Sequence, residues 1–324
     1  MPIWQIVLFF VILGVMRVVQ KVCSKKVSNQ IEGNTYFHYG GYYQLLSAVF
    51  SLIMLFIVGF HGFNGTMMLC AAGTAAFMAL ALFTEIEALK GSSLIVGQMF
   101  QAGALFIPCL FGNFFIEGQR MNVWQWLGLC VFMVAMYLMI SQGRKKDGEK
   151  PKQKVSVKTI IMLVLMLLGE GGTMVVQNAF GNLVEDANTA MYSFLMFAIN
   201  AVVLYICYLV QAIFFKKPKK NAISVAAETE TQATTKKAEK ALKPLSKVLL
   251  ICGAFLAFAL FLINILVTEL TAAIPPALLF SLSNAIAIIV TMLVGRFVYG
   301  EKMSIRNVIG IVLCAGSLAM ISFL

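Results

Sequence analysis

Several ionisable residue types are scarce in this chain of 324 residues, and their scarcity excludes whole classes of site. The only aspartates are Asp147 and Asp186, and the only histidines are His38 and His61. Both aspartates fall in predicted loops, so an intramembrane pair of catalytic aspartates is excluded, and two histidines are too few for a multi-histidine metal site. The chain also has no Walker motif, which excludes ATP-driven chemistry. We therefore expect no enzymatic activity, no cofactor and no metal.

Charge is sparse overall, since 12% of the residues are charged while 60% are hydrophobic and the mean hydropathy is +0.88. Apolar stretches long enough to cross a bilayer recur from end to end, and spanning segments must be helical because lipid offers exposed backbone groups no partner. The seven cysteines are scattered singly, nearly all in these stretches, which favours packing roles. We predict an all-α integral membrane protein with ten transmembrane helices, at 2–22, 37–60, 67–89, 92–116, 123–141, 159–180, 189–215, 247–268, 273–299 and 305–324.

Basic residues are distributed almost entirely on one side of this predicted arrangement. If the chain crosses ten times, 23 of the 25 lysines and arginines fall at one membrane face; the other face has only Arg120, and Arg17 lies inside the first helix. Because basic loops stay in the cytoplasm, we expect both termini outside, in a bacterial plasma (inner) membrane. The net charge of +11 thus reflects topology, and we expect the lipid bilayer, not nucleic acid, as a partner.

The chain also repeats itself. "GVMRVVQK" at residues 14–21 matches "GGTMVVQN" at 171–178 with an offset of 157. "EGQRMNVWQWLG" at 117–128 matches "YGEKMSIRNVIG" at 299–310 with an offset of 182, and the offset grows because the second half carries an extra loop. Since five helices per half is an odd number, the halves would be inverted in the membrane, and such repeats place a site near the midplane between them.

This repeat predicts the organisation of the chain. The ranges are a first five-helix repeat at 1–141, a basic cytoplasmic linker at 142–158, and a second repeat at 159–324 with a disordered basic loop at about 216–246.

The pattern resembles the drug/metabolite transporter superfamily, in its EamA-like ten-helix branch. "VYGEKMSIRNVIGIVLCAGSLAMI" at 298–321 is the most typical piece, and "ALKGSSLIVGQMF" at 88–100 resembles the start of the family's fourth helix. Two features depart from the family: Gln119 stands in the first half where the second has Glu301, and familiar members keep their termini in the cytoplasm. The resemblance implies the architecture and a transport function, and it does not identify a substrate.

Glu170 is the first candidate site residue, because "LLGEGGTMVVQN" at 167–178 places it deep inside a predicted helix. A carboxylate there is costly unless it is neutralised or faces a wet cavity. Gln177 shares its helical face. The segment is similar to the first helix of small multidrug resistance transporters, where a lone glutamate and a polar residue eight positions later, here Glu170 and Asn178, bind protons and cationic drugs. We expect Glu170 to bind a proton that substrate displaces, with a structural ion pair to Arg17 as the alternative.

Arg17 and Gln20 lie on one face of the first helix with Lys21. They can bind an anionic group; the alternative is that Arg17 and Lys21 snorkel to the interface, which is what we expect of Lys21. If Arg17 pairs with Glu170 the site suits zwitterions, and if the two stay apart a lone carboxylate suits cations. Glutamates near helix ends, Glu85 among them, could gate the cavity by pairing with Lys90 or Lys302, but for Glu85 we expect a solvated helix terminus.

Further polar candidates lie in the predicted fourth, eighth and ninth helices. Gln98 and Gln101 are one turn apart on one face, and Ser283 and Asn284 match Gln101 and Ala102 in the repeat. These four, with Asn264, either line the cavity or hydrogen-bond between helices. For Gly169, Gly171 and Gly172 we expect close helix approach or space beside Glu170.

The predicted function is secondary active transport of a small organic solute, drug or metabolite. One half would rock against the other, with helix kinks at Pro108, Pro275 and Pro276 as hinges, and protons would couple through Glu170. A lipid or nucleotide-sugar translocator of the same fold is the alternative. The expected partners are a small-molecule substrate and protons; the direction of transport, such as efflux, and a homodimer stay open.

Overall fold

The computed structural model describes residues 3–28, 30–31, 35–115, 121–140, 156–184, 188–214, 245–271, 276–300 and 305–323. The predicted linker at 142–158 lies outside the described residues except for its last three, and the predicted basic loop at about 216–246 except for its last two.

Within these ranges the chain forms eleven helices: α1 (Ile3–Ser28), α2 (Thr35–Val58), α3 (Gly65–Gly91), α4 (Leu94–Gly103), α5 (Phe106–Phe115), α6 (Val123–Ile140), α7 (Val157–Leu183), α8 (Thr189–Phe214), α10 (Lys247–Thr271), α11 (Pro276–Phe297) and α12 (Ile305–Phe323). In the described part, seven stretches are long and apolar enough to cross a membrane: α1, α2, α3, α4 together with α5, α7, α8 and α10. Shorter apolar stretches lie in α6, α11 and α12. The prediction of an all-α protein of membrane type is therefore confirmed.

Several helices begin at a polar residue that caps their free backbone N–H groups. Asn64 accepts a 2.7 Å hydrogen bond from the Met67 N–H at the start of α3. The Ser93 hydroxyl accepts one of 3.2 Å from the Val96 N–H at the start of α4. Asn188 does the same for α8, at 3.0 Å from the Met191 N–H. These caps explain why helices start within a few residues of where the apolar runs begin.

The first helix extends further than predicted, to Ser28 and not to residue 22. Its last turns are polar in sequence but buried in part, because Val27 packs into the core and the Lys25 ammonium donates to the carbonyls of Leu89 and Ser92, each at 2.7 Å. Lys25 thereby satisfies backbone acceptors at the end of α3, which holds the two helix ends together.

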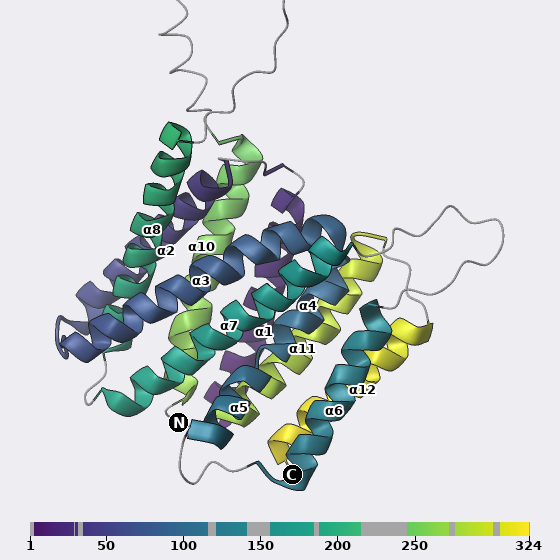
Figure 1. Cartoon of the computed structure of the whole chain (residues 1–324). Coiled ribbons are helices and arrows are strands. Elements are labelled where there is room, and N and C mark those ends of the chain that lie inside the picture. The colour runs from purple at the N-terminus through teal and green to yellow at the C-terminus, as the bar shows by residue number, and fades with distance from the viewer. Residues whose placement is uncertain are drawn as a thin grey trace, which may run out of the picture.

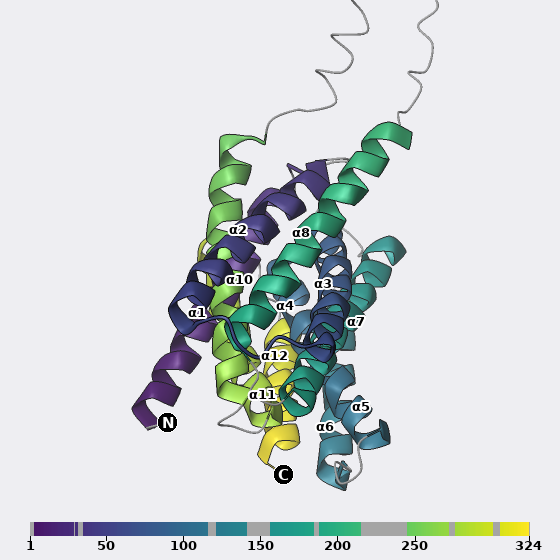
Figure 2. The same ribbon diagram turned by 90° about the vertical axis from the view of Figure 1, so that its left-hand side faces the viewer.

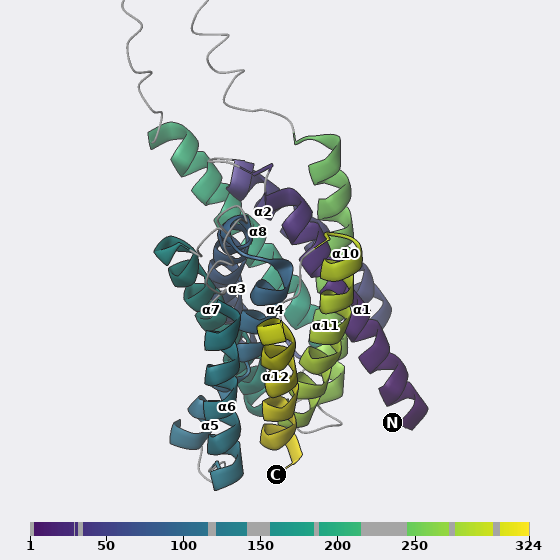
Figure 3. The same ribbon diagram turned by 90° about the vertical axis from the view of Figure 1, so that its right-hand side faces the viewer.

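Helix packing brings together segments that are far apart in the sequence. α3 packs against α7, α1 against α10, and α2 against α8. The helices α6 and α12 pack on each other and form one edge of the bundle (Figures 1 and 3). The two chain ends lie at the same end of the bundle, opposite the end where α8 finishes and α10 begins (Figures 1 and 2).

The predicted fourth transmembrane helix is interrupted, forming α4 and α5 with a break at Ala104 and Leu105. Pro108 explains the position of the break, because proline has no N–H to donate to the carbonyl four residues earlier, which is that of Ala104. That carbonyl accepts instead from the Ile107 N–H at 3.1 Å, in a tighter turn. The kink expected at Pro108 is therefore confirmed, while Pro275 lies outside the described residues. A kink at Pro276 is wrong, because Pro276 is the first residue of α11, where a missing N–H breaks no hydrogen bond of the helix.

Candidate functional site

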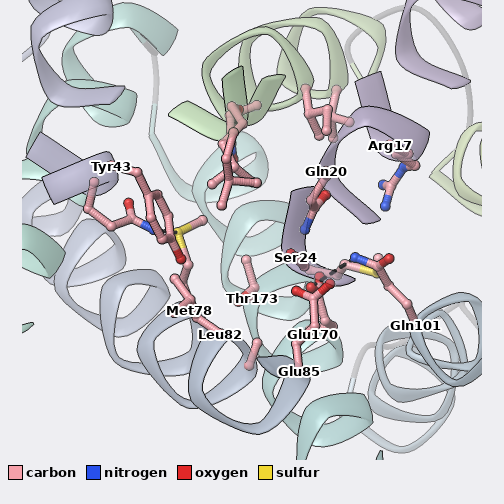
Figure 4. A pocket seen from close by; sticks show the side chains of 18 of the residues that line it. Arg17, Gln20, Ser24, Tyr43, Met78, Leu82, Glu85, Gln101, Glu170 and Thr173 are labelled. Atoms are coloured by element: carbon pink, nitrogen blue, oxygen red, sulfur yellow. Dashed lines mark hydrogen bonds between the residues drawn. The ribbon is translucent and has the colours of Figure 1, made fainter. Parts of the chain in front are cut away.

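A cavity of about 70 Å³ lies inside the bundle, where α1, α2, α3, α4, α7 and α10 meet (Figure 4). A buried water needs roughly 10–15 Å³ measured in this way, so the cavity has room for roughly five to seven waters. Its polar lining is Arg17, Gln20, Ser24, Tyr43, Gln44, Glu85, Gln101, Glu170, Thr173, Gln177 and Asn264. The remaining lining is apolar and comes from α3, α7 and α10: Met78, Ala81, Leu82, Ile86, Met174, Leu256, Leu260, Ile263 and Val267.

Glu170 occupies the centre of α7 (Val157–Leu183), which has thirteen residues on each side of it. At about 1.5 Å per residue its backbone is roughly 20 Å from either end, which is mid-depth for a spanning helix. Its Oε1 accepts a 3.0 Å hydrogen bond from Nε2 of Gln101 on α4 (Figure 4). As predicted, Glu170 lies at a cavity deep in the bundle.

The glycines beside Glu170 let two neighbouring helices approach it. A Cβ atom on Gly169 would lie 2.7 Å from the backbone nitrogen of Ala81 on α3. A Cβ on Gly171 would lie 2.8 Å from the carbonyl oxygen of Ala104, at the break between α4 and α5. The close approach expected from these glycines is confirmed, and it brings the break to the same level as the carboxylate.

Arg17 is buried in α1 and lines the same cavity. Its Nε donates a 3.1 Å hydrogen bond to the hydroxyl of Ser283 on α11. The alternative of a structural ion pair with Glu170 is wrong for this conformation: among the described residues, no carboxylate oxygen lies within 4.0 Å of the Arg17 guanidinium. The cavity therefore has a cation and an anion that each contact a neutral partner.

Lys21 and Glu85 form an ion pair in the interior, with 2.8 Å between Nζ and Oε1. Lys21 is 0% exposed and Glu85 is 4% exposed, so the expected snorkelling of Lys21 and the expected solvated terminus at Glu85 are both wrong. Two buried opposite charges in contact avoid the large cost of an isolated buried ion. Glu85 lines the cavity, whereas Lys21, which contacts Glu85, is not part of the lining.

Gln177 and Asn264 extend the polar lining across the cavity from α7 to α10. Nε2 of Gln177 donates to Oδ1 of Asn264 at 2.6 Å, and Nδ2 of Asn264 donates to the Leu260 carbonyl at 2.9 Å. Both residues, with Gln20 on α1, are therefore lining residues as predicted.

Three predicted site residues lie outside the cavity lining. Ser283 is buried and acts as the hydrogen-bond acceptor for Arg17. Gln98 and Asn284 are buried, and neither side chain has a hydrogen-bond partner among the described residues. Gln98 and Gln101 are one turn apart in the sequence, but of the two only Gln101 lines the cavity.

The structure adds lining residues that the sequence did not single out, chiefly Ser24, Tyr43 and Gln44. The pairing of Glu85 with Lys21 could have been predicted from the helix ends. Lys21 precedes the end of α1 by seven residues, and Glu85 precedes the end of α3 by six, so the two lie at a similar depth. Because the first helix was predicted to end at residue 22, Lys21 was expected at the interface and not at the depth of Glu85. In the described part of the chain, no three His, Cys, Asp or Glu side chains come together as metal ligands would.

Comparison with known proteins places the fold and leaves the activity undefined. No protein-family model matches the chain, and no curated protein matches it either. Its fold is similar to that of a solved structure described only as "Crystal structure of protein", with a TM-score of 0.56 and 10% sequence identity. The similarity covers 96% of this chain and 98% of the other, so it extends over the whole helical bundle.

Proposed function

We propose that this protein is a secondary active transporter of the EamA-like drug/metabolite type, which moves a small organic solute by alternating access. The observation that carries the proposal is the cavity itself: it lies at mid-depth in a bundle of apolar helices, and charged and amide side chains line it. Four helices from the first half of the chain and two from the second half surround it. A site between two halves is what a rocking mechanism requires.

Helix neighbours support ten crossings arranged as two inverted five-helix repeats. Under the repeat, α1 corresponds to α7, α2 to α8, α3 to α10, α4 with α5 to α11, and α6 to α12. The contact of α3 with α7 then has its counterpart in the contact of α1 with α10. Likewise, α5 contacts α7 as α11 contacts α1, and α3 contacts α8 as α10 contacts α2. The pairs α2–α8 and α6–α12 are their own counterparts, as expected on a twofold axis.

Glu170 is the residue we propose for proton coupling. Without substrate, the carboxyl would hold a proton and keep its hydrogen bond with Gln101. A substrate with a cationic group would displace the proton and bind the carboxylate. Because proton and substrate compete for the same oxygen atoms, one would cross the membrane in exchange for the other.

The size of the cavity favours a small solute over the alternative cargoes. A space for roughly five to seven waters matches a molecule of amino-acid size and is far smaller than a nucleotide sugar or a phospholipid. The basic ends of the helices would face the cytoplasm of a bacterial plasma membrane, with both termini outside.

A ligand screen followed by a transport assay tests this proposal. Detergent-purified protein is heated with amino acids, polyamines, lipophilic cations and nucleotide sugars at two pH values, and the stabilising class is then followed into proteoliposomes under a pH gradient. We expect one class to stabilise the protein more at the higher pH and to cross the membrane against the proton flow. In Glu170→Gln the effect of pH should disappear.

The matched control is Glu87→Gln, which also removes one carboxylate. Glu87 lies outside the cavity lining and pairs with Lys90 and Lys158, which are solvent-exposed or partly so. This variant should keep both the pH effect and transport. If a ligand binds but no flux occurs under any gradient, the protein is not a transporter of that ligand and the proposal is wrong.

A further inference from the structure

The cavity contains two opposite charges that have spare hydrogen-bonding capacity. Arg17 carries five N–H donors, and in the described part of the chain its one recorded side-chain hydrogen bond goes from Nε to Ser283. Glu170 has two carboxylate oxygens, and its recorded bond there is the one that Oε1 accepts from Gln101. Both partners are neutral, so neither charge is compensated by the group it contacts.

The third charge in the lining is compensated. Glu85 lines the cavity, and the ammonium of Lys21 contacts it at 2.8 Å. Arg17, Glu85 and Glu170 line one cavity, and Lys21 contacts Glu85, so the four charges are counted together. When all are ionised, the four groups have two positive and two negative charges and are neutral together. Without Lys21, the other three would carry one net negative charge.

We expected charges that stay apart to suit cations, but that expectation assumed a lone carboxylate, and Arg17 lines the same cavity as Glu170. From these observations we infer the class of substrate: a small zwitterion, such as a single amino acid with an apolar side chain. Its carboxylate would bind Arg17, its ammonium would bind Glu170, and its side chain would face the apolar lining from α3, α7 and α10. Lys21 is a specificity-determining residue, because it neutralises Glu85 and so keeps the cavity from selecting simple cations. This inference rests on the proposed transport function and makes its cargo specific.

Charge complementarity explains why both ends of the substrate are needed. A carboxylate alone would contact Arg17 and leave Glu170 without a cationic partner, and an amine alone would contact Glu170 and leave the Arg17 charge uncompensated. Each one-charge ligand therefore makes only one of the two charge-assisted contacts. A zwitterion compensates both at once. In the structure Arg17 contacts Ser283 and Glu170 contacts Gln101, so each charge is held separately and can bind one end of a zwitterion.

The first experiment compares three ligands of similar shape on the purified protein. L-Leucine carries both charges, isoamylamine is leucine without the carboxylate, and isocaproate is leucine without the amine. Affinities come from thermal stabilisation at a series of concentrations. We expect each analogue to bind at least about tenfold more weakly than leucine, because each loses one charge-assisted contact. Equal or tighter binding of isoamylamine would overturn the inference in favour of a cation site, and no response to leucine or to other apolar amino acids would overturn it outright.

The second experiment tests Lys21. In Lys21→Met, Glu85 loses its counter-ion, and the ratio of leucine affinity to isoamylamine affinity should fall by on the order of tenfold. The double variant Lys21→Met/Glu85→Gln removes both charges and should restore the ratio. If the single variant does not fold because of its uncompensated carboxylate, the opposite change is used: Glu85→Gln leaves Lys21 without its anion and should raise the ratio above that of Lys21→Gln/Glu85→Gln. A ratio that does not change with the charge of this pair would refute the role of Lys21.

Failure of this inference can be told apart from failure of the proposed function. If isoamylamine or a polyamine binds and is taken up by proteoliposomes, the transporter proposal stands and the zwitterion inference is wrong. If leucine binds with the expected selectivity but no flux of leucine occurs in either direction, the site is correctly assigned and the transport function is wrong.

Discussion

Replacing Gly171 by alanine should push α7 away from the break between α4 and α5. A Cβ atom at position 171 would lie 2.5 Å from Cβ of Ile107 and 2.8 Å from the carbonyl oxygen of Ala104. Neither atom is the free end of a flexible side chain, so the clash is relieved only if backbone segments move. The segment that must move carries Gln101, which donates to Glu170, so the same displacement should weaken this hydrogen bond.

The cost can be worked out by comparison with a second glycine of the same helix. A Cβ atom on Gly181 would meet no other atom within 4 Å, and Gly181 is solvent- or lipid-exposed. Alanine in place of glycine stabilises a helix by about 0.5–1 kcal/mol at either site. Overpacking costs about 1–3 kcal/mol at a tight site only. The difference between Gly171→Ala and Gly181→Ala therefore isolates the packing cost, about 1–3 kcal/mol.

The assay is reversible unfolding of the purified protein in mixed micelles with increasing denaturing detergent, followed by the helical circular dichroism signal. We expect Gly181→Ala to be as stable as the unmodified protein or more stable, and Gly171→Ala to be less stable than Gly181→Ala by the stated amount. Equal free energies of unfolding for the two variants would refute the close approach of α7 to the break. Substrate stabilisation should also be weaker in Gly171→Ala alone.

Three further changes test other parts of the structure. Pro108→Ala restores a missing N–H and should raise the free energy of unfolding by up to about 3 kcal/mol, while slower uptake in proteoliposomes would show that the break is needed for transport. Lys25→Met removes two hydrogen bonds to backbone carbonyls and should destabilise the protein by about 1–3 kcal/mol in the same unfolding assay. The hydroxyls of Thr74 and Tyr192 lie 2.6 Å apart, and a double-mutant cycle with Thr74→Val and Tyr192→Phe should give a coupling energy of about 0.5–1.5 kcal/mol.

Much of the fold could be predicted because lipid leaves the backbone few choices. An apolar run of some twenty residues must be a helix, so composition alone located the elements to within a few residues at most ends. The close helix approach at the glycines around Glu170 could also be predicted, since small residues beside a deep polar group permit close packing. The kink near Pro108 follows from a missing donor, which is a property of the residue itself.

The pairing of charges was less predictable, because it depends on where helices end and which of them are neighbours. An end at residue 22 made Lys21 an interfacial residue, whereas the observed end at Ser28 makes it an interior one. The extension of α1 depends on Lys25 binding the carbonyls of α3, which is a tertiary contact. Once α1 and α3 lie together, Lys21 and Glu85 fall at nearly the same distance from the helix ends and meet.

Three features that are unfavourable in a membrane helix occur at the same depth in this bundle. A carboxylate at Glu170, glycines on either side of it and a proline-induced break at Ala104 each destabilise a helix when taken alone. The structure brings them into contact: Gly171 packs on the break, and the break carries Gln101 to Glu170. Local conflicts of this kind are expected where function requires them. Since α4 ends at the break, a change in its angle relative to α5 would alter the contact of Gln101 with the Glu170 carboxylate on α7.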